Sequence, residues 1–332
     1  MEQQHQFGSL NIWDLLITPI YLFVILALAT RYRDRKYPKD HPYHKLYMQG
    51  LYLKMAGAIF IGLIYSFYYA GGDTFAYHFH ATVINSADSI PTWFKLMWRV
   101  SPDSDPKLYE YTTQMLWYRE AATFTVARIA AVFGLFNGTH YLPTAILFAY
   151  FSFTGVWAMY TTFSRLYPNI AKKLAVAFLF IPSVVVWGSS IFKDTICLFS
   201  LGWMTYSLFR MFIQRDFSLK NVGILALCIY LLAVIKIYIL IAIMPALMLW
   251  LLLTYSKKIR SVGMRWAINL GSVAALSAVF LFSMTYFSAQ LDEYSLDKII
   301  AKSQKTQSYL QYMSALQEGS GYNLGDYAPT PA

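Results

Sequence analysis

The sequence predicts an all-α, polytopic transmembrane helix bundle with about eight spans. Apolar residues make up 57% of the 332 residues and charged residues only 13%, whereas a soluble globular protein carries about 25% charged residues. The apolar runs are continuous, which favours helices over the alternating ~10-residue strands of a transmembrane barrel. Aromatic residues reach 18%, as expected for a chain with many membrane–water boundaries.

The expected spans follow the apolar runs in order. They are residues 13–30, 51–70, 141–163, 174–192, 195–213, 222–235, 237–254 and 266–287. The first is not expected to be a cleaved signal peptide, because its N-terminal flank contains no Lys or Arg. The run 222–235 is short against the ~20 residues that a crossing needs. Basic residues on both sides of 222–254 nevertheless require two crossings, with Lys236 at a tight outer turn.

Loop charge predicts the orientation of these spans. Basic residues concentrate in the loops 31–47, 164–173, 208–221 and 255–265, which by the positive-inside rule face the cytoplasm. Both termini are then outside, in a multi-pass protein of the cytoplasmic (inner) membrane. The net charge of +10 is accounted for by these loops, and no nucleic-acid-binding motif is present.

The loop 71–140 on the outer face is expected to hold interfacial helices. Residues 121–137 are apolar enough to cross, but a crossing there would move every later basic loop to the other side. Residues 91–100 mix Trp, Lys and Arg as interfacial helices do. The predicted organisation is a transmembrane domain over 1–287, followed by an outer amphipathic helix and flexible tail over 288–332.

Asp73 is the first candidate for chemistry. It follows Gly71 and Gly72, directly after a span on the outer face. A partly desolvated carboxylate there could act as a general base with a raised pKa, bind a divalent cation, or simply cap the next helix. His78 and His80 follow it, and a zinc site would need a third ligand such as His140 or Asp88. Interfacial packing or hydrogen bonding to substrate is the favoured interpretation of the two histidines.

A second candidate segment runs over 180–195. Pro182 is expected to kink this span, and Lys193 and Asp194 lie at its outer tip. Lys193 could bind a phosphate, with Asp194 orienting it or coordinating a metal, and Lys236 is a further cation at the same depth. Both lysines could instead be snorkelling anchors or members of salt pairs.

Two further cations lie within apolar runs. Arg128 is costly in its apolar helix unless it is paired. Lys54 is expected near the inner end of its span, with its ammonium snorkelling to the cytoplasm. Arg128 is assigned to the same outer face as Asp73, Lys193, Asp194 and Lys236. A carboxylate facing several cations suits a substrate with a hydroxyl acceptor and an anionic phosphate leaving group.

These features together resemble integral-membrane glycosyltransferases of the GT-C type and the related polysaccharide polymerases. The resemblance rests on the outer-face Asp73, the long first outer loop, and the Pro/Trp/Ser-containing span that ends in Lys193–Asp194. It implies a polyprenyl-phosphate-linked sugar donor, a catalytic role for Asp73, and binding of the lipid phosphate by Lys193 and Lys236. Thr74 stands where the family often has a second acidic residue.

Three classes of function remain open from the sequence. The first is a glycosyltransferase-like enzyme, with the lipid donor and membrane lipids as partners. The second is a non-catalytic integral-membrane subunit of a larger envelope complex, binding other membrane subunits through its outer loop and tail. A transporter or lipid flippase is disfavoured, because the charges cluster at one face instead of near the bilayer middle.

Overall fold

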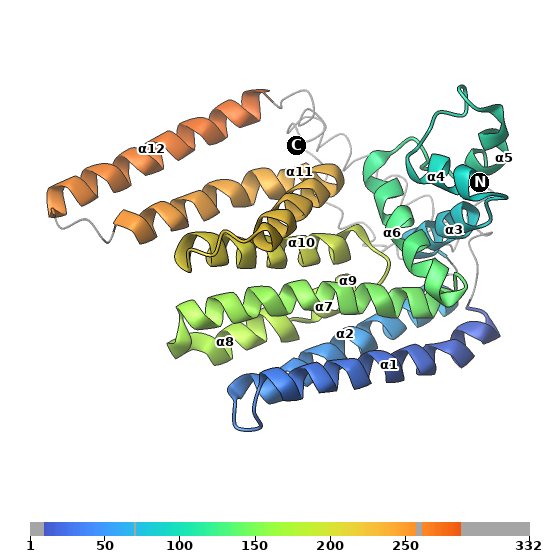
Figure 1. Ribbon diagram of the computed structural model, residues 1–332, viewed down its shortest axis with the longest axis horizontal. Coiled ribbons are helices and arrows are strands. Elements are labelled where there is room, and N and C mark those ends of the chain that lie inside the picture. The colour runs from blue at the N-terminus through green and yellow to red at the C-terminus, as the bar shows by residue number, and fades with distance from the viewer. Residues whose placement is uncertain (1–9, 70, 257–260, 287–332) are drawn as a thin grey trace, which may run out of the picture. The chain divides into compact units, whose positions relative to one another are not determined.

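The computed structural model describes residues 10–69, 71–256 and 261–286, and over these residues every regular element is a helix (Figure 1). Five helices in this part of the chain are long and apolar enough to cross a membrane. They are α1 (Ile12–Lys36), α2 (Pro42–Phe67), α7 (Tyr141–Leu166), α10 (Lys193–Leu208) with its π-helical extension η5 (Phe209–Ile213), and α11 (Leu219–Ser256). The predicted all-α class and membrane character are therefore confirmed.

The described residues up to 240 form one compact unit, in which α7 is the central helix. It packs against α1, α2, α6 (Ala121–Asn137) and α10, and it is the most buried of the five long helices. Its contact with α10 is made backbone to backbone, since a Cβ atom on Gly202 would lie 1.8 Å from the carbonyl oxygen of Gly155. Small residues that allow such close approach are typical of helix pairs in membranes.

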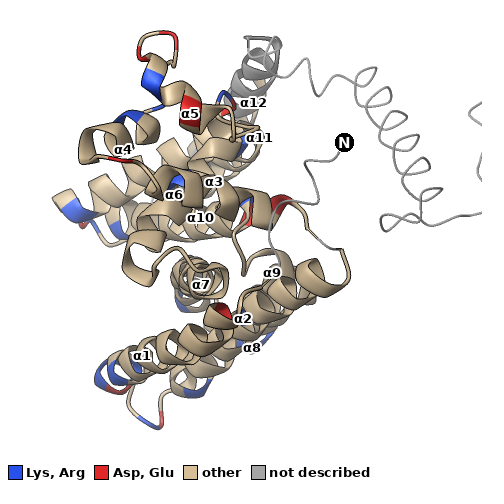
Figure 2. Ribbon diagram, turned by 90° about the vertical axis from the view of Figure 1, so that its right-hand side faces the viewer, with Lys and Arg blue, Asp and Glu red and all other residues tan. Residues whose placement is uncertain are grey.

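The two ends of this unit differ in charge. Figure 1 shows the connections from α1 to α2, from α7 to α8 (Ala171–Ala175) and from η5 to α11 at one end, and the segment from α3 (Asp73–Asn85) to α6 at the other. The first end therefore collects three of the four basic loops, as the positive-inside pattern predicts. Figure 2 shows charge gathered at helix ends and in loops, with the long helices mostly uncharged along their length. The fourth basic loop includes residues outside those described.

The predicted span 174–192 is not one helix. The chain forms α8 (Ala171–Ala175), the π-helical turn η4 (Val176–Phe180) and α9 (Pro182–Trp187). Ile181 between them is extended, with φ −65° and ψ 123°, because a residue before proline is disfavoured in the helical region and proline cannot donate a backbone hydrogen bond. The kink expected at Pro182 is therefore confirmed.

The segment between α2 and α7 is largely helical. It contains α3 (Asp73–Asn85), α4 (Ile90–Met97), η2 (Pro106–Leu108), α5 (Tyr109–Thr112) and α6 (Ala121–Asn137). The helices predicted over 121–137 and 91–100 are thus present as α6 and α4. Figure 1 shows α6 running steeply across the direction of α7, and α6 packs mainly on α3.

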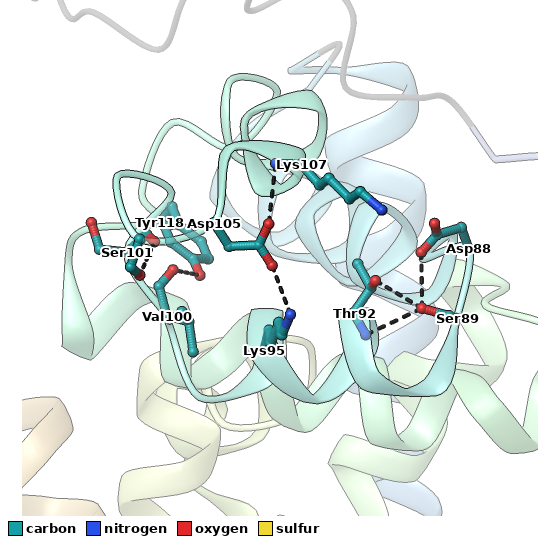
Figure 3. A network of polar contacts seen from close by, with 10 residues as sticks. Asp88, Ser89, Thr92, Lys95, Val100, Ser101, Asp105, Lys107 and Tyr118 are labelled. Carbon is teal, nitrogen blue, oxygen red and sulfur yellow. Dashed lines mark hydrogen bonds and ion pairs between the residues drawn. The ribbon is translucent and has the colours of Figure 1, made fainter.

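Polar contacts hold the segment around α4 in place (Figure 3). The Ser89 hydroxyl caps α4 by accepting from the backbone N–H of Thr92. Lys95 forms an ion pair with Asp105 at 2.7 Å. The Tyr118 hydroxyl donates to the Val100 carbonyl at 2.8 Å. These contacts link α4 and the residues after it to the turns that lead towards α6. The segment between α2 and α7 is therefore folded rather than an open loop.

Helix α11 is interrupted at Lys236, whose φ of −147° and ψ of 76° are non-helical. The helical stretches on either side are 219–235 and 237–256, which correspond to the predicted spans 222–235 and 237–254. The described residues from 241 onward belong to a second unit, which contains α12 (Val262–Tyr286). The predicted outer helix and tail over 288–332 lie outside the described residues.

Candidate functional site

Asp73 is the first residue of α3, and two glycines bring the chain to it. Gly71 and Gly72 have φ values of 137° and 133°, which L side chains rarely adopt. A Cβ atom on Gly72 would also lie 2.5 Å from the Tyr65 ring. Gly72 occupies the N-cap position without a side-chain hydrogen bond, so Asp73 is not the helix cap. Its carboxylate lies in the first helical turn, where negative charge is favourable.

The surroundings of Asp73 raise the pKa of its carboxyl group. Desolvation is the main cause, Lys193 opposes it, and Glu120 adds to it. The side chain still reaches the surface, so solvent limits the size of the rise. Within the described residues no side chain forms a hydrogen bond or ion pair with the Asp73 carboxylate. The carboxylate is therefore available to accept a proton from a ligand.

Two lysine–carboxylate pairs lie at the same end of the unit. Lys193 Nζ is 3.2 Å from Glu120 Oε1, and Lys236 Nζ is 2.5 Å from Asp194 Oδ1. Burial raises the pKa of the Tyr77 phenol, and the negative charges of Asp73, Glu120 and Asp194 raise it further. All three carboxylates are therefore near Tyr77. We call Asp73, Glu120, Lys193, Asp194 and Lys236 the charged cluster.

The charged cluster differs from the expected carboxylate facing several cations. It holds three carboxylates and two lysines, and both lysines already have a carboxylate partner. Its formal charge is therefore −1 when Asp73 is ionised. Glu120 is the member that sequence reasoning missed. The available signal was its place in the outer loop, immediately before the apolar helix 121–137.

Arg128 lies outside the charged cluster. Its guanidinium donates to the Thr125 hydroxyl at 2.6 Å and to the Met97 carbonyl at 3.3 Å, and it lies over the Phe124 ring. Met97 is the last residue of α4, where backbone carbonyls lack helical partners and favour a nearby cation. The hydrogen bond to α4 thus stabilises the Arg128 cation in this apolar helix. The structure does not bring Arg128 to the predicted site.

His78 and His80 occupy different environments. His78 Nε2 is 3.0 Å from the Thr139 carbonyl, and burial lowers the pKa of this ring to about 4. His80 is fully buried against Trp117, and neither of its ring nitrogens has a partner among the described residues. Burial also lowers the pKa of His80 to about 4. A neutral imidazole leaves one donor and one acceptor, which a hydroxyl group or water can satisfy.

A metal site of protein ligands is not found in the part of the chain that the structure describes. No group of three or more His, Cys, Asp or Glu side chains there could hold an ion. Cys197 and Cys228 are buried and free, as their positions in apolar runs indicate.

Lys54 does not snorkel to the cytoplasm. Its side chain is 2% exposed, and its ammonium donates to the Ser152 hydroxyl and to the carbonyls of Val184 and Gly188. The prediction was wrong because α2 begins at Pro42 rather than at residue 51. Lys54 therefore lies in the middle of the helix, too far from either end for its ammonium to reach water.

Three hydroxyls link the turn after α9 to α3 and α7. Thr74 and Tyr141 are joined at 2.9 Å, Thr74 and Ser190 at 3.2 Å, and Tyr141 and Ser190 at 3.1 Å. Thr74 is completely buried in this triangle. The Thr74 hydroxyl thus joins α3 to α7 and to the turn after α9. Asp73 has no acidic neighbour at position 74.

Comparison of the chain with protein-family models, with curated proteins and with solved structures finds no match.

Proposed function

We propose that the protein is a membrane glycosyltransferase that transfers a sugar from a polyprenyl-phosphate-linked donor at the outer face of the membrane. The observation that carries this proposal is the charged cluster, in which the Asp73 carboxyl group has a raised pKa, lies near Lys193, and forms no hydrogen bond or ion pair with the described residues. Asp73 would accept the proton of the acceptor hydroxyl. The acceptor oxygen would form the new bond to the anomeric carbon while the polyprenyl phosphate leaves with its electron pair, in a single inverting displacement.

Lys193 and Lys236 would receive the phosphate. Both carry half-exposed carboxylate partners, with Glu120 and Asp194 each 51% exposed. Exposed ion pairs contribute only about 0–1 kcal/mol, so a phosphate with several acceptor oxygens can replace the carboxylates. Tyr77 and His80 lie four and seven residues after Asp73 in α3, on the same face of the helix, and would contact the sugar or acceptor.

The topology proposed with this function has eight spans and both termini outside. Residues 171–192 run from the end with the basic loops to the end with the charged cluster, which supports a crossing by a broken helix (Figure 1). The interruption at Lys236 supports two crossings within α11, because 38 residues make a helix of about 57 Å against a hydrocarbon core of about 30 Å. The charged cluster then faces outward and α6 lies in the outer interface.

A binding experiment tests the proposal. The protein in lipid nanodiscs is titrated with a polyprenyl phosphate. We expect Lys193→Met and Lys236→Met each to weaken binding by about tenfold or more, since a hydrogen bond to a charged group contributes about 1.5–3 kcal/mol. The control is Lys45→Met, an exposed lysine of α2 outside the charged cluster. Unchanged binding in both cluster variants would refute the phosphate site.

The alternative of a non-catalytic envelope subunit is favoured by one observation, the pairing of both lysines with carboxylates. It predicts no saturable binding of polyprenyl phosphate and no sugar transfer. A transporter is favoured only by the buried Lys54 in the middle of a long apolar helix. All three hydrogens of that ammonium are already donated to protein acceptors, which leaves none for a transported ligand.

A further inference from the structure

Lys54 is a buried cation without a carboxylate partner among the described residues. Taking an ammonium out of water is costly unless it is paired or hydrogen-bonded. Here each of its three hydrogens has an acceptor, at 3.2 Å in Ser152, 2.9 Å in Val184 and 2.8 Å in Gly188. All three ammonium hydrogens are thus donated to acceptors within the protein. The role of Lys54 therefore depends on the segments that these acceptors belong to.

Two of these acceptors are backbone carbonyls at the end of α9. The last carbonyls of a helix have no partner within the helix, and α9 has only six residues. Such groups must be satisfied inside the protein at membrane depth, and a cation is favoured at a helix C-terminus. Gly188 permits the approach, because a Cβ atom there would lie 2.6 Å from Lys54 Nζ.

The carbonyls that Lys54 binds lie directly before the charged cluster. Gly188 starts the turn that leads into α10 at Lys193. Within this turn Ser189 and Ser190 are fully buried, and the Ser190 carbonyl accepts from the Thr195 hydroxyl at 2.6 Å. Lys54 therefore holds one end of a short, buried turn whose other end carries Lys193 and Asp194.

We infer that Lys54 is a positioning residue: its ammonium acts as a tethered cation that terminates α9 inside the bundle and fixes the turn 188–192, and thereby Lys193 and Asp194. The consequence for sugar transfer rests on the proposed function, whereas the fixing of the turn does not. Three contacts converge on this turn, from α2 through Lys54, from α3 through Thr74 and from α7 through Tyr141. Of these three contacts, the one from Lys54 is made by an ammonium group and the other two by hydroxyl groups.

The test measures how well the turn is held, by the reactivity of a buried thiol. Ser190→Cys is placed in a chain in which Cys197 and Cys228 are replaced by Ala, and its modification by a small maleimide is timed in nanodiscs. We expect Lys54→Met to accelerate modification by about tenfold or more, because it removes the charged hydrogen bonds to Val184 and Gly188. The matched control, Lys45→Met, places the same substitution at an exposed position of α2 and should leave the rate unchanged.

A second pair of variants distinguishes loss of the Lys54 hydrogen bonds from a general loosening of helix packing. Ser152→Ala removes one acceptor of the ammonium and should accelerate modification by about twofold to fivefold in the Lys54 protein. In the Lys54→Met background it should add nothing, since residues that act through one interaction are not additive. Additive effects would overturn the inference.

Unchanged modification in Lys54→Met would also overturn it. If Lys54→Met does not fold, Ser152→Ala and Gly188→Ala carry the test, and unchanged rates in both would reject the tether. Sugar transfer is measured on the same samples. Accelerated modification with no transfer by any protein, the unsubstituted one included, would support the tether and reject the proposed function. Sugar transfer by the unsubstituted protein, together with an unchanged thiol modification rate in Lys54→Met, would support the proposed function and reject the tether.

Discussion

Replacing Glu120 by Gln has two expected effects, which follow from its ion pair with Lys193 and from the effect of its charge on Asp73. The change removes the charge that pairs with Lys193 at 3.2 Å. It also removes one of the charges that raise the pKa of Asp73. If a phosphate competes with Glu120 for Lys193, the variant should bind polyprenyl phosphate more tightly than the unsubstituted protein.

The size of the gain follows from the exposure of the pair. Glu120 is 51% exposed and Lys193 25%, so the pair belongs with solvent-accessible salt bridges that contribute about 0.2–1 kcal/mol. Coulomb's law gives a similar value, about 1 kcal/mol for unit charges at 4 Å in water. Release of Lys193 should therefore tighten binding by about 1.5- to 5-fold, and the gain should shrink as salt screens the pair.

The second effect has a definite sign. Asp73 acts as a base only when ionised, so activity falls as the pH drops through its pKa. Removing the negative charge of Glu120 lowers this pKa, and the acid limb of the pH–rate profile should move to lower pH. Lys193→Met removes the opposing charge and should move the limb to higher pH. The assay is kcat/KM for sugar transfer over pH 4–8, and weaker phosphate binding by Glu120→Gln or shifts of equal sign in the two variants would refute the reasoning.

Three other outcomes follow from single positions. Asp73→Asn should lower sugar transfer by about 10²–10⁴-fold while polyprenyl phosphate binding stays within twofold, and transfer at the unsubstituted rate would reject the catalytic role. Gly202→Ala should destabilise the protein by about 1–3 kcal/mol, because its Cβ meets the backbone of α7; Gly223→Ala, with nothing within 4 Å, is the control in thermal unfolding. Cysteine at Ser104 should react with an impermeant thiol reagent in intact cells and cysteine at Ser218 should not, whereas labelling of both would refute the proposed orientation.

The helical class and the positions of most long helices could be predicted because they depend on local properties. An apolar run of sufficient length must be helical to satisfy its backbone in a membrane. The helix ends were less accurate, since helices continue into polar sequence. The first span was expected to end at residue 30, but α1 continues to Lys36. Proline at 182 gave the break in the fourth span, because its effect on the backbone is also local.

The partners within the site could not be predicted, since they come from distant parts of the chain. Lys54 and Gly188 are 134 residues apart, and Lys193 and Glu120 are 73 apart. The topology predicted which end of the bundle each residue occupies, and this was sufficient to bring Asp73, Lys193, Asp194 and Lys236 to one end. It could not show that each lysine meets a carboxylate there, or that Arg128 turns towards α4, because both depend on side-chain packing.

The acceptors of the lysines separate those that can exchange partners from those that cannot. Lys54 is bound by backbone carbonyls inside the bundle, whereas Lys193 and Lys236 are bound by half-exposed carboxylates that water can solvate after release. A donor phosphate at Lys193 would place negative charge beside Asp73 and cancel the charge that now lowers its pKa. The pKa of Asp73 should then be higher in the donor complex than in the free protein. Since kcat reports the complex and kcat/KM the free enzyme, the acid limb of kcat should lie at higher pH than that of kcat/KM, and coincident limbs would show that the phosphate binds away from Lys193.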